Sequence, residues 1–240
     1  MKYKLIINFL ALTLSLSLFS QISADRPDQT EGTYVLKKGN AQIETGWTFE
    51  ENGYLNTLLR FGVFKGLELR VNTNLISSAG DMMGLFPEIG DLELGAKFRL
   101  LNNNSRTKIS FASNLSIPVG DYGEDGILNS LLVSHDLSES FQVAYNIGYD
   151  KYFENQQRRG ENSVFVYSLV MSKSFGRLGA FIEIFGEDGA EESDSSWDFG
   201  LTYLIKDYLQ ADISYGNGIN NGSSYLSIGA AWNFSLKSNK

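Results

Sequence analysis

Apolar and polar side chains alternate with a period of two residues through much of the chain after residue 40. From Gly66 to Ile76, Leu67, Leu69 and Val71 alternate with charged or amide-bearing residues, and the same pattern recurs from Asp91 to Leu100. Successive side chains of a β-strand point to opposite faces, so this period is typical of a strand with one apolar and one polar face. The pattern predicts an all-β protein.

Twelve segments have this pattern. The length of each is close to that of a tilted strand that crosses a bilayer, which is about 9–11 residues. They are Ala41 to Glu50, Tyr54 to Phe64, Gly66 to Ile76, Asp91 to Leu100, Lys108 to Ile117, Ile127 to Asp136, Ser140 to Asp150, Ser163 to Lys173, Leu178 to Gly186, Ser196 to Ile205, Tyr208 to Asn217 and Ser224 to Phe234. Two segments have a weaker pattern: Ile127 to Asp136 places His135 on the same face as Leu131 and Val133, and Leu178 to Gly186 has bulky side chains on both faces. A β-bulge would shift the parity of either segment.

The connections between these segments alternate between short and long. The short ones are Lys65 to Gly66, Asn102 to Ser105, Leu137 to Glu139, Ser174 to Arg177 and Lys206 to Asp207. The others are Ser77 to Gly90, Pro118 to Gly126, Lys151 to Asn162, Glu187 to Ser195 and Gly218 to Ser223, with Glu51 to Gly53 as a short exception. An even strand number with this alternation predicts an antiparallel transmembrane β-barrel of about 12 strands, with short periplasmic turns, longer extracellular loops and both ends periplasmic.

A soluble β-sandwich is the alternative, because it also has alternating strands and frequent turns. Its strands usually have about 5–6 residues, shorter than the segments found here. A sandwich also gives no reason for connections that alternate in length, or for charged residues along the polar faces. These features favour the barrel.

The first 24 residues have the features of a signal peptide. Lys2 and Lys4 precede an apolar run from Leu5 to Phe19, and small residues follow as far as Ala24. An uncleaved membrane anchor is the alternative, but this run is shorter than the roughly 20 residues that span a bilayer as a helix. We therefore expect export and cleavage after Ala24.

The chain then divides into four parts: a signal peptide at 1–24, an N-terminal segment at 25–39, a barrel at 40–234 and a C-terminal tail at 235–240. The N-terminal segment cannot span a bilayer by itself. We expect it to lie in the periplasm or to enter the lumen as a partial plug.

Composition and charge agree with an exported membrane barrel. Loss of Lys2 and Lys4 with the signal peptide would change the formal net charge from −8 to −10, which argues against a nucleic-acid partner. The chain has no cysteine, so disulfides and thiolate metal sites are excluded. Abundant glycine (24 residues), tyrosine (12) and phenylalanine (16) suit strands with aromatic girdles. We expect no metal site and no cofactor.

Charged side chains of both signs lie on the polar faces of the predicted strands and are the candidate pore-lining residues. They are Glu44, Arg60, Glu68, Arg70, Glu93, Lys97, Arg99, Glu183, Asp198 and Asp212. A barrel of 8 strands is filled by side chains and one of 16–18 strands holds an aqueous channel, so about 12 strands predict a constricted lumen. These charges could select solutes in an open pore. They could equally form an ion-pair network that closes the lumen.

Ser134, His135 and Asp136 resemble a catalytic triad in the printed sequence. His135 is the only histidine of the chain. On a strand, however, Ser134 and Asp136 point to the face opposite His135. We therefore predict that the protein is not an enzyme.

Two predicted long connections are rich in carboxylates: Glu187, Asp188, Glu191, Glu192 and Asp194 in one, and Asp121, Glu124 and Asp125 in the other. Such loops can hold Ca²⁺. Neither has the spacing of an EF-hand, which favours solvated acidic loops.

The sequence resembles the phenol-degradation meta-pathway outer-membrane family. The motifs that carry the resemblance are Asp25-Arg26-Pro27-Asp28 with Thr30-Glu31 and Gly39, Gln42 to Gly46, Gly90-Asp91-Leu92 with Gly95 and Lys97, Pro118 to Gly120, and Ile228-Gly229 with Trp232 and Phe234. They extend over nearly the whole chain after the signal peptide. The chain departs from many barrel proteins, which end on the aromatic residue read by the assembly machinery, because Ser235 to Lys240 follow Phe234.

This resemblance implies a channel-like protein in the outer membrane of a Gram-negative bacterium. Its expected partners are outer-membrane lipid, the outer-membrane assembly machinery and a small solute. The sequence thus predicts passive passage of small solutes, aromatic ones among them, through a narrow lumen of mixed charge. A structural or ligand-binding barrel closed by ion pairs is the alternative.

Overall fold

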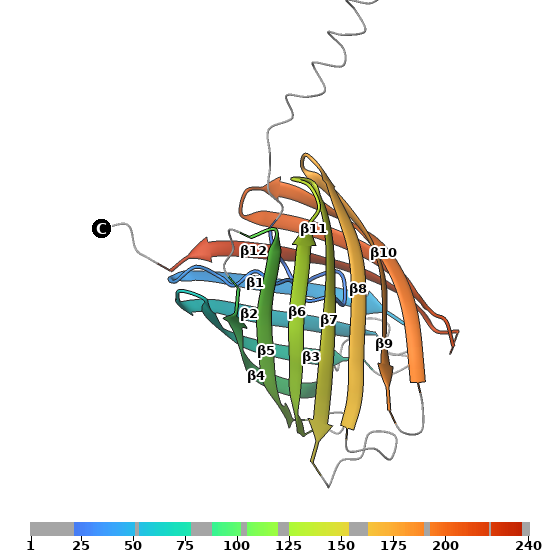
Figure 1. Ribbon diagram of the computed structural model, residues 1–240. Coiled ribbons are helices and arrows are strands. Elements are labelled where there is room, and N and C mark those ends of the chain that lie inside the picture. The colour runs from blue at the N-terminus through green and yellow to red at the C-terminus, as the bar shows by residue number, and fades with distance from the viewer. Residues whose placement is uncertain are drawn as a thin grey trace, which may run out of the picture.

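The computed structural model describes residues 22–50, 53–77, 88–101, 105–119, 125–153, 163–189, 193–220 and 222–236. Within these ranges twelve strands form one closed antiparallel barrel (Figure 1). They are β1 (Asn40–Phe49), β2 (Tyr54–Phe64), β3 (Leu67–Ile76), β4 (Glu88–Arg99), β5 (Thr107–Pro118), β6 (Gly126–Asp136), β7 (Phe141–Tyr152), β8 (Ser163–Phe175), β9 (Leu178–Asp188), β10 (Ser193–Lys206), β11 (Leu209–Gly218) and β12 (Ser224–Ser235).

Each strand pairs with its neighbours in sequence, and the first strand closes the barrel by pairing with the last. The register of this closing pair runs from Asn40 opposite Ser235 to Phe49 opposite Leu226. The predicted twelve-stranded barrel is confirmed, and the β-sandwich alternative is wrong. The part of the chain that the structure describes contains no helix long and apolar enough to cross a membrane.

The predicted strand bounds agree with the observed ones to within three residues. The differences of three residues lie at the starts of β4 and β10. At β9 and β10, Ser193 pairs with Asp188 and Asp194 with Glu187. These pairs lengthen both strands, so the predicted loop Glu187 to Ser195 shortens to residues 189–192. Glu187, Asp188 and Asp194 therefore lie on strands, which corrects their prediction as loop residues. Asp125 lies just before β6, and Asp121, Glu124, Glu191 and Glu192 lie outside the described residues.

Strands β6 and β9, whose sequence patterns are the weakest, have a regular register. Both β6 and β9 pair with their neighbours without a bulge, so the anticipated shift in parity does not occur. Register shifts occur elsewhere, at Gly62/Phe64, Thr73/Leu75 and Leu204/Lys206. Two of these three lie beside two-residue turns.

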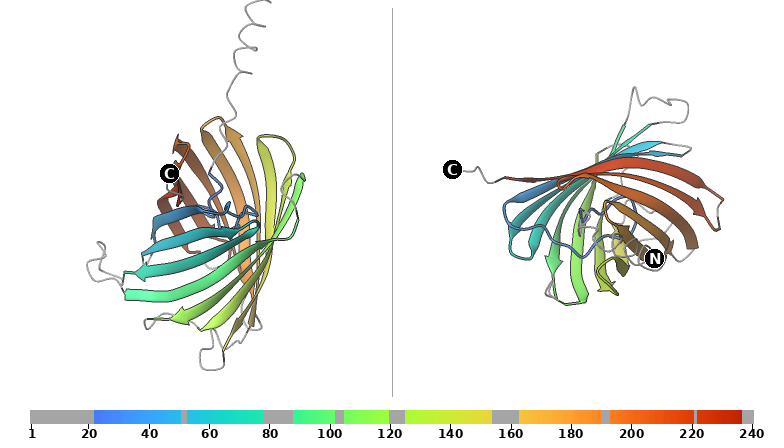
Figure 2. Two further views of the ribbon diagram at one scale, coloured as in Figure 1. Left: turned by 90° about the vertical axis from the view of Figure 1, so that its left-hand side faces the viewer. Right: turned by 90° about the horizontal axis from the view of Figure 1, so that it is seen from above.

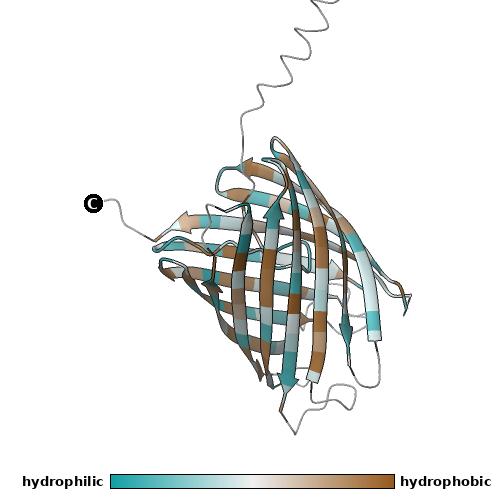
Figure 3. Cartoon of the chain, viewed as in Figure 1, coloured by the Kyte–Doolittle hydropathy of each residue, from teal (hydrophilic) through white to brown (hydrophobic). Residues whose placement is uncertain are grey.

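The outer face of the barrel is apolar. Large aliphatic side chains are exposed along it, among them Leu69, Ile147, Met171, Ile182, Ile213 and Ile228. Figure 3 shows the alternation of hydrophobic and hydrophilic residues along the strands. An apolar belt of this extent on a closed barrel is the surface that contacts lipid.

Aromatic side chains gather on the outer face near both ends of the strands. Trp197, Phe199 and Tyr215 form a cluster near the long-loop end, with ring centroids 6.0–6.2 Å apart. Trp232 and Phe234 lie near the short-turn end, with centroids 5.5 Å apart. Such girdles are found where a barrel meets the two membrane–water interfaces.

The chain before β1 lies inside the barrel. The predicted N-terminal segment (25–39) passes through the lumen together with residues 22–24 before it, and Figure 2 shows them as the blue coil enclosed by the strands. From here on the name N-terminal segment means residues 22–39. Val35 and Leu36 are completely buried there. Gly62 of β2 makes the close passage possible, because a Cβ atom at this position would lie 2.2 Å from the carbonyl oxygen of Lys37.

Candidate functional site in the barrel lumen

The N-terminal segment is hydrogen-bonded to strands around the lumen. The hydroxyls of Thr33 and Ser134 lie 2.7 Å apart, and Thr30 donates to Ser168 at 2.8 Å. On another side of the lumen, the amide of Ile22 donates to Gln210 Oε1 at 3.1 Å. These contacts fix the segment to β6, β8 and β11.

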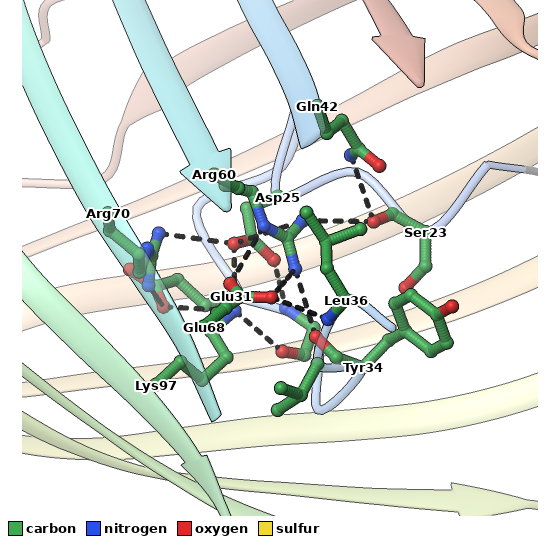
Figure 4. A network of polar contacts seen from close by, with 12 residues as sticks. Ser23, Asp25, Glu31, Tyr34, Leu36, Gln42, Arg60, Glu68, Arg70 and Lys97 are labelled. Atoms are coloured by element: carbon green, nitrogen blue, oxygen red, sulfur yellow. Dashed lines mark hydrogen bonds and ion pairs between the residues drawn. The ribbon is translucent and has the colours of Figure 1, made fainter. Parts of the chain in front are cut away.

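A buried ionic network joins the segment to β1 through β4 (Figure 4). Arg60 of β2 is its centre: its guanidinium lies 2.9 Å from Glu44, 2.9 Å from Glu68 and 3.5 Å from Asp25 of the segment. The side chains of Arg60, Glu44 and Glu68 are fully buried. Since water is excluded, the ion pairs themselves must compensate the cost of burying these charges.

Asp25 of the segment is shared among three cations. Besides Arg60, it lies 3.1 Å from Arg70 and 2.8 Å from Lys97. Both cations also pair with Glu31 of the segment. Burial alone would raise the pKa of Asp25, but the positive charges of Arg60, Lys97 and Arg70 outweigh it and lower this pKa. Asp25 is thus a fixed anion that ties the segment to three strands.

Carboxylates of the barrel also bind the main chain of the segment. Glu68 accepts from the amide of Leu36 at 2.7 Å, and Glu183 accepts from the amide of Gln29 at 2.7 Å. Glu44 accepts from the amides of Asp25 at 2.7 Å and Arg26 at 3.1 Å. A coil has no partner strand for its amides, so these carboxylates satisfy donors that would otherwise be buried alone.

The side chain of Arg26 packs against two paired glycines, Gly46 of β1 and Gly229 of β12. A Cβ atom at Gly46 would lie 2.1 Å from the Arg26 guanidinium, and one at Gly229 would lie 2.5 Å from it. The guanidinium donates to Asp212 at 3.2 Å and to Ser227 at 2.9 Å. The absence of side chains at the glycine pair makes the space that Arg26 occupies.

Above the segment, toward the long-loop ends of the strands, lies a cavity of about 330 Å³. Residues 25–29 of the segment line one side of it. Its wall is rich in amide and phenol groups, contributed by Tyr54, Asn56, Asn72, Asn74, Asn114 and Tyr225. Asn56 donates to the side-chain oxygens of both Asn72 (2.9 Å) and Asn74 (2.8 Å). The cavity therefore offers neutral hydrogen-bonding groups on the barrel wall, next to the charged side chains of Arg70 and Glu93 and of the segment itself.

All ten candidate pore-lining residues lie on inward-facing positions. Eight of them contact the segment by hydrogen bonds or ion pairs: Glu44, Arg60, Glu68, Arg70, Lys97, Arg99, Glu183 and Asp212. The other two bind the barrel: Glu93 accepts from Asn72 at 3.3 Å, and Asp198 accepts from the Tyr225 hydroxyl at 2.6 Å. That these residues line a conducting pore stays a prediction.

Several residues at this site were not identified from the sequence. The small hydroxyl residues Ser110, Ser134 and Ser168 are buried against the segment, and Ser110 donates to the carbonyl of Thr33 at 2.7 Å. Serine at an inward position gives no signal in an alternating pattern. For Asp25 and Glu31 the signal was present, because both belong to the motifs that carry the family resemblance.

Ser134, His135 and Asp136 do not form a catalytic triad. Ser134 faces the lumen and contacts Thr33, whereas His135 lies on the outer face, 3.0 Å from the Thr107 hydroxyl. Asp136 pairs with Lys108 at 2.5 Å. The strand geometry separates the three groups as predicted.

The closed barrel, its apolar outer face and its polar lumen define a transmembrane β-barrel of the bacterial outer membrane. The family model described as "Putative MetA-pathway of phenol degradation" matches residues 24–236. The chain belongs to this family. None of the curated proteins compared with the chain matches it.

Solved outer-membrane barrels have the same fold. The KdgM porin is 13% identical, with a TM-score of 0.63 over 80% of this chain and 99% of the porin. The NanC porin is 10% identical, with a TM-score of 0.63 over 80% of this chain and 98% of the other. The COG4313 outer membrane channel from Pseudomonas putida F1 is 15% identical, with a TM-score of 0.57 over 83% and 97%. At these identities the likeness shows the fold.

Residues from three of the family motifs lie together in the lumen. Asp25 and Arg26 come from the first motif, Glu44 and Gly46 from the second, and Gly229 from the last, and the contacts described above join all five. The resemblance thus rests largely on residues that hold the N-terminal segment in place.

Proposed function

We propose that this protein is a passive channel for small solutes and that the N-terminal segment is a plug that sets its open area. The observation that carries the proposal is the polar cavity, which ends directly on residues 25–29 of the segment. A solute entering from the long-loop side would meet the segment together with Glu31 and Arg70 of the ionic network, which also line the cavity. Passage therefore requires the segment to move or to leave.

The lining of the cavity favours solutes with hydroxyl or other hydrogen-bonding groups. Asparagine amides and tyrosine hydroxyls can replace the water around such groups without a large change in charge. Solutes of this class include hydroxylated aromatic compounds, which agrees with the description of the family. A bare hydrocarbon ring would find few apolar partners among the residues lining this cavity.

The plug is held by contacts that water can replace. Its main-chain amides and carboxylates bind charged side chains, and these groups are well solvated once the segment leaves. Val35 and Leu36 are its completely buried apolar side chains. Ile22, which packs with Leu204 and Ala231, lies before the predicted cleavage site and would leave with the signal peptide. A lumen-filling segment of this composition suits a removable plug better than a permanent core.

The test is conductance in planar bilayers, with the wild-type protein and a variant that lacks Asp25 to Lys38. We expect small or rare openings from the wild type and a large increase in open conductance from the deletion. His135→Ala serves as a control, because His135 lies on the outer face. No conductance and no solute flux from either protein would overturn the proposal.

A permanently closed structural or ligand-binding barrel is the second candidate. The complete burial of Arg60, Glu44, Glu68 and Lys97 favours it, because every one of these charges is already paired. Arg70→Ala discriminates the two. In the channel proposal it removes two contacts to the plug and raises conductance, whereas in a closed barrel it lowers thermal stability alone.

The same proposal includes the absence of enzymatic activity and insertion by the outer-membrane assembly machinery. For the latter, Trp232 and Phe234 lie on the outer face near the short-turn end of β12, although Phe234 is not the last residue of the chain. Ser235 pairs with Asn40 and is the last residue of the closing strand.

A further inference from the structure

The buried carboxylate of Glu44 accepts from two consecutive main-chain nitrogens of the segment. Its Oε2 accepts from the amide of Asp25 at 2.7 Å and from that of Arg26 at 3.1 Å. Its other oxygen accepts from Arg60 at 2.9 Å and from Gln42 at 2.8 Å. Glu44 is completely buried. Oε2 thus carries a charge that two neutral amides solvate.

The ionic network around Glu44 has one negative charge too many. Its cations are Arg60, Arg70 and Lys97, and its anions are Asp25, Glu31, Glu44 and Glu68. Arg60 alone serves three of these anions. Glu31 is partly exposed, at 26%, whereas Asp25, Glu44 and Glu68 are almost completely buried. An uncompensated charge among buried carboxylates is costly, and the network would gain from a fourth cation.

Signal-peptide cleavage would supply such a cation at the nitrogen of Asp25, which contacts Glu44. The signal peptide is predicted to end at Ala24, so that Asp25 would become the first residue of the mature chain. In the cleavage reaction water adds across the Ala24–Asp25 peptide bond. The carboxylate leaves on the released peptide, and the nitrogen of Asp25 becomes an α-ammonium group, which is charged at neutral pH.

We propose that Glu44 is the binding site for the α-ammonium group of the mature N-terminus at Asp25. The ammonium nitrogen is the atom already 2.7 Å from Glu44 Oε2, and its charge makes the network four cations and four anions. This site would pair the new terminus inside the lumen as the plug enters. The inference does not depend on whether solutes pass through the barrel.

Removal of residues 22–24 leaves the network satisfied. The carbonyl of Ser23 accepts from Arg60 at 3.0 Å and from Gln42 at 3.2 Å, and both contacts disappear on cleavage. Both donors keep Glu44 Oε1 as an acceptor. Cleavage exchanges two contacts to a neutral carbonyl for a charged contact to a carboxylate.

The first experiment uses the protein purified from outer membranes. Mass spectrometry of the intact chain should place its first residue at Asp25. Acetylation of the α-amino group, quantified by peptide mass spectrometry, should then be at least ten-fold slower in the folded barrel than in the heat-unfolded chain. A mature chain that begins elsewhere, or an amine that reacts at the same rate in both states, would overturn the proposal.

Two variants test whether Glu44 causes this protection. Glu44→Gln should raise the acetylation rate of the folded protein about ten-fold. Asp198→Asn is the matched control, because Asp198 is also a buried carboxylate on the lumen wall but binds Tyr225 instead of the segment. Equal protection in the Glu44→Gln and Asp198→Asn proteins would contradict the assignment.

A third variant keeps the test informative where Glu44→Gln folds poorly. Insertion of Gly-Ser between Ala24 and Asp25 moves the ammonium two residues away from Glu44. In the protein that retains Glu44, the insertion should lower the unfolding temperature of the barrel. In the Glu44→Gln background, the insertion should change this temperature much less. If the insertion lowers stability equally in both backgrounds, or in neither, the ammonium does not bind Glu44.

Discussion

The lumen has two unlike walls. Strands β1 to β4 present the long charged side chains of Glu44, Arg60, Glu68 and Lys97. Strands β6 to β9 present mostly small or apolar side chains, with Glu183 of β9 as an exception. On the second wall Leu132 is fully buried, and Ala144, Val170 and Phe181 form a buried cluster. The N-terminal segment lies between the two and is bound by ion pairs on one side and by hydroxyl contacts on the other.

The two walls of the lumen have different roles. Ion pairs and carboxylate–amide bonds on the charged wall are specific, and water can replace them when the segment leaves. Packing on the apolar wall is close and independent of the segment's charges. We infer that the charged wall determines whether the plug is held, and that the apolar wall determines the shape of the lumen.

The largest expected effect is that of Arg60→Ala. The substitution leaves Asp25, Glu44 and Glu68 without their shared cation, and breaking a buried ion pair costs about 3–5 kcal/mol. We expect a marked fall in the urea midpoint of unfolding, together with increased conductance of the barrels that remain folded. A variant as stable as wild type would show that the charged wall does not hold the plug.

Phe181→Ala tests the apolar wall. Removal of this buried ring should cost about 3 kcal/mol, since it leaves a cavity beside Ala144 and Val170. Stability should fall, but the conductance of the folded protein should stay near the wild-type value. Ile182→Ala, which truncates an exposed side chain on the same strand, is the control. A large rise in conductance for Phe181→Ala would mean that both walls hold the plug.

Gly46→Ala adds one methyl group to the charged wall. This methyl would overlap the Arg26 guanidinium, and overpacking of this kind costs about 2 kcal/mol. We expect Arg26 to move away from Asp212, with a smaller rise in conductance than for Arg60→Ala. Combining Gly46→Ala with Arg26→Ala should restore part of the lost stability, because the clash with the guanidinium disappears while the 2.7 Å approach to the Ile228 carbonyl oxygen remains. A full additive loss in the double variant would contradict this account.

Asp28→Asn should have the smallest effect. Burial, and then the negative charge of Glu183, raise the pKa of Asp28 well above its usual value. A carboxyl group of this kind stabilises the fold most below its unfolded pKa of about 4, and it loses this contribution as the pH rises through the folded pKa. The variant should therefore gain about 1 kcal/mol relative to wild type at pH 8 and little at pH 4. An equal gain at both pH values would contradict the raised pKa.

The charged wall could be predicted from the sequence, and the apolar wall could not. In β3 and β4 the alternation is strict, so the inward positions of Glu68, Arg70 and Lys97 followed directly from the period of two. In β6 and β9 inward residues such as Leu132 and Phe181 are as bulky as outward ones, because they fill the lumen beside the segment. A two-residue pattern carries no information about what occupies the interior.

The path of the N-terminal segment also could not be predicted from the alternating pattern. A coil has no periodicity, and its position depends on carboxylates that bind its main chain, such as Glu68 at Leu36. Its acidic and basic residues could be recognised only through the family motifs. The choice between a periplasmic and a lumenal position therefore required three-dimensional contacts.

The most direct test of the account is a disulfide that locks the plug in the lumen. The hydroxyls of Thr33 and Ser134 lie 2.7 Å apart, and the wild-type chain has no cysteine, so the double variant Thr33→Cys with Ser134→Cys can form only this bridge within one chain. Thr33→Cys with Ser214→Cys, on β11, is the control pair.

On oxidation, the Thr33→Cys, Ser134→Cys variant should form the intramolecular disulfide, which mass spectrometry detects. We predict that its conductance then falls below the wild-type level until a reductant is added. The control pair should form no bridge and should conduct like wild type. A bridged protein that conducts as well as the deletion of Asp25 to Lys38 would contradict the account.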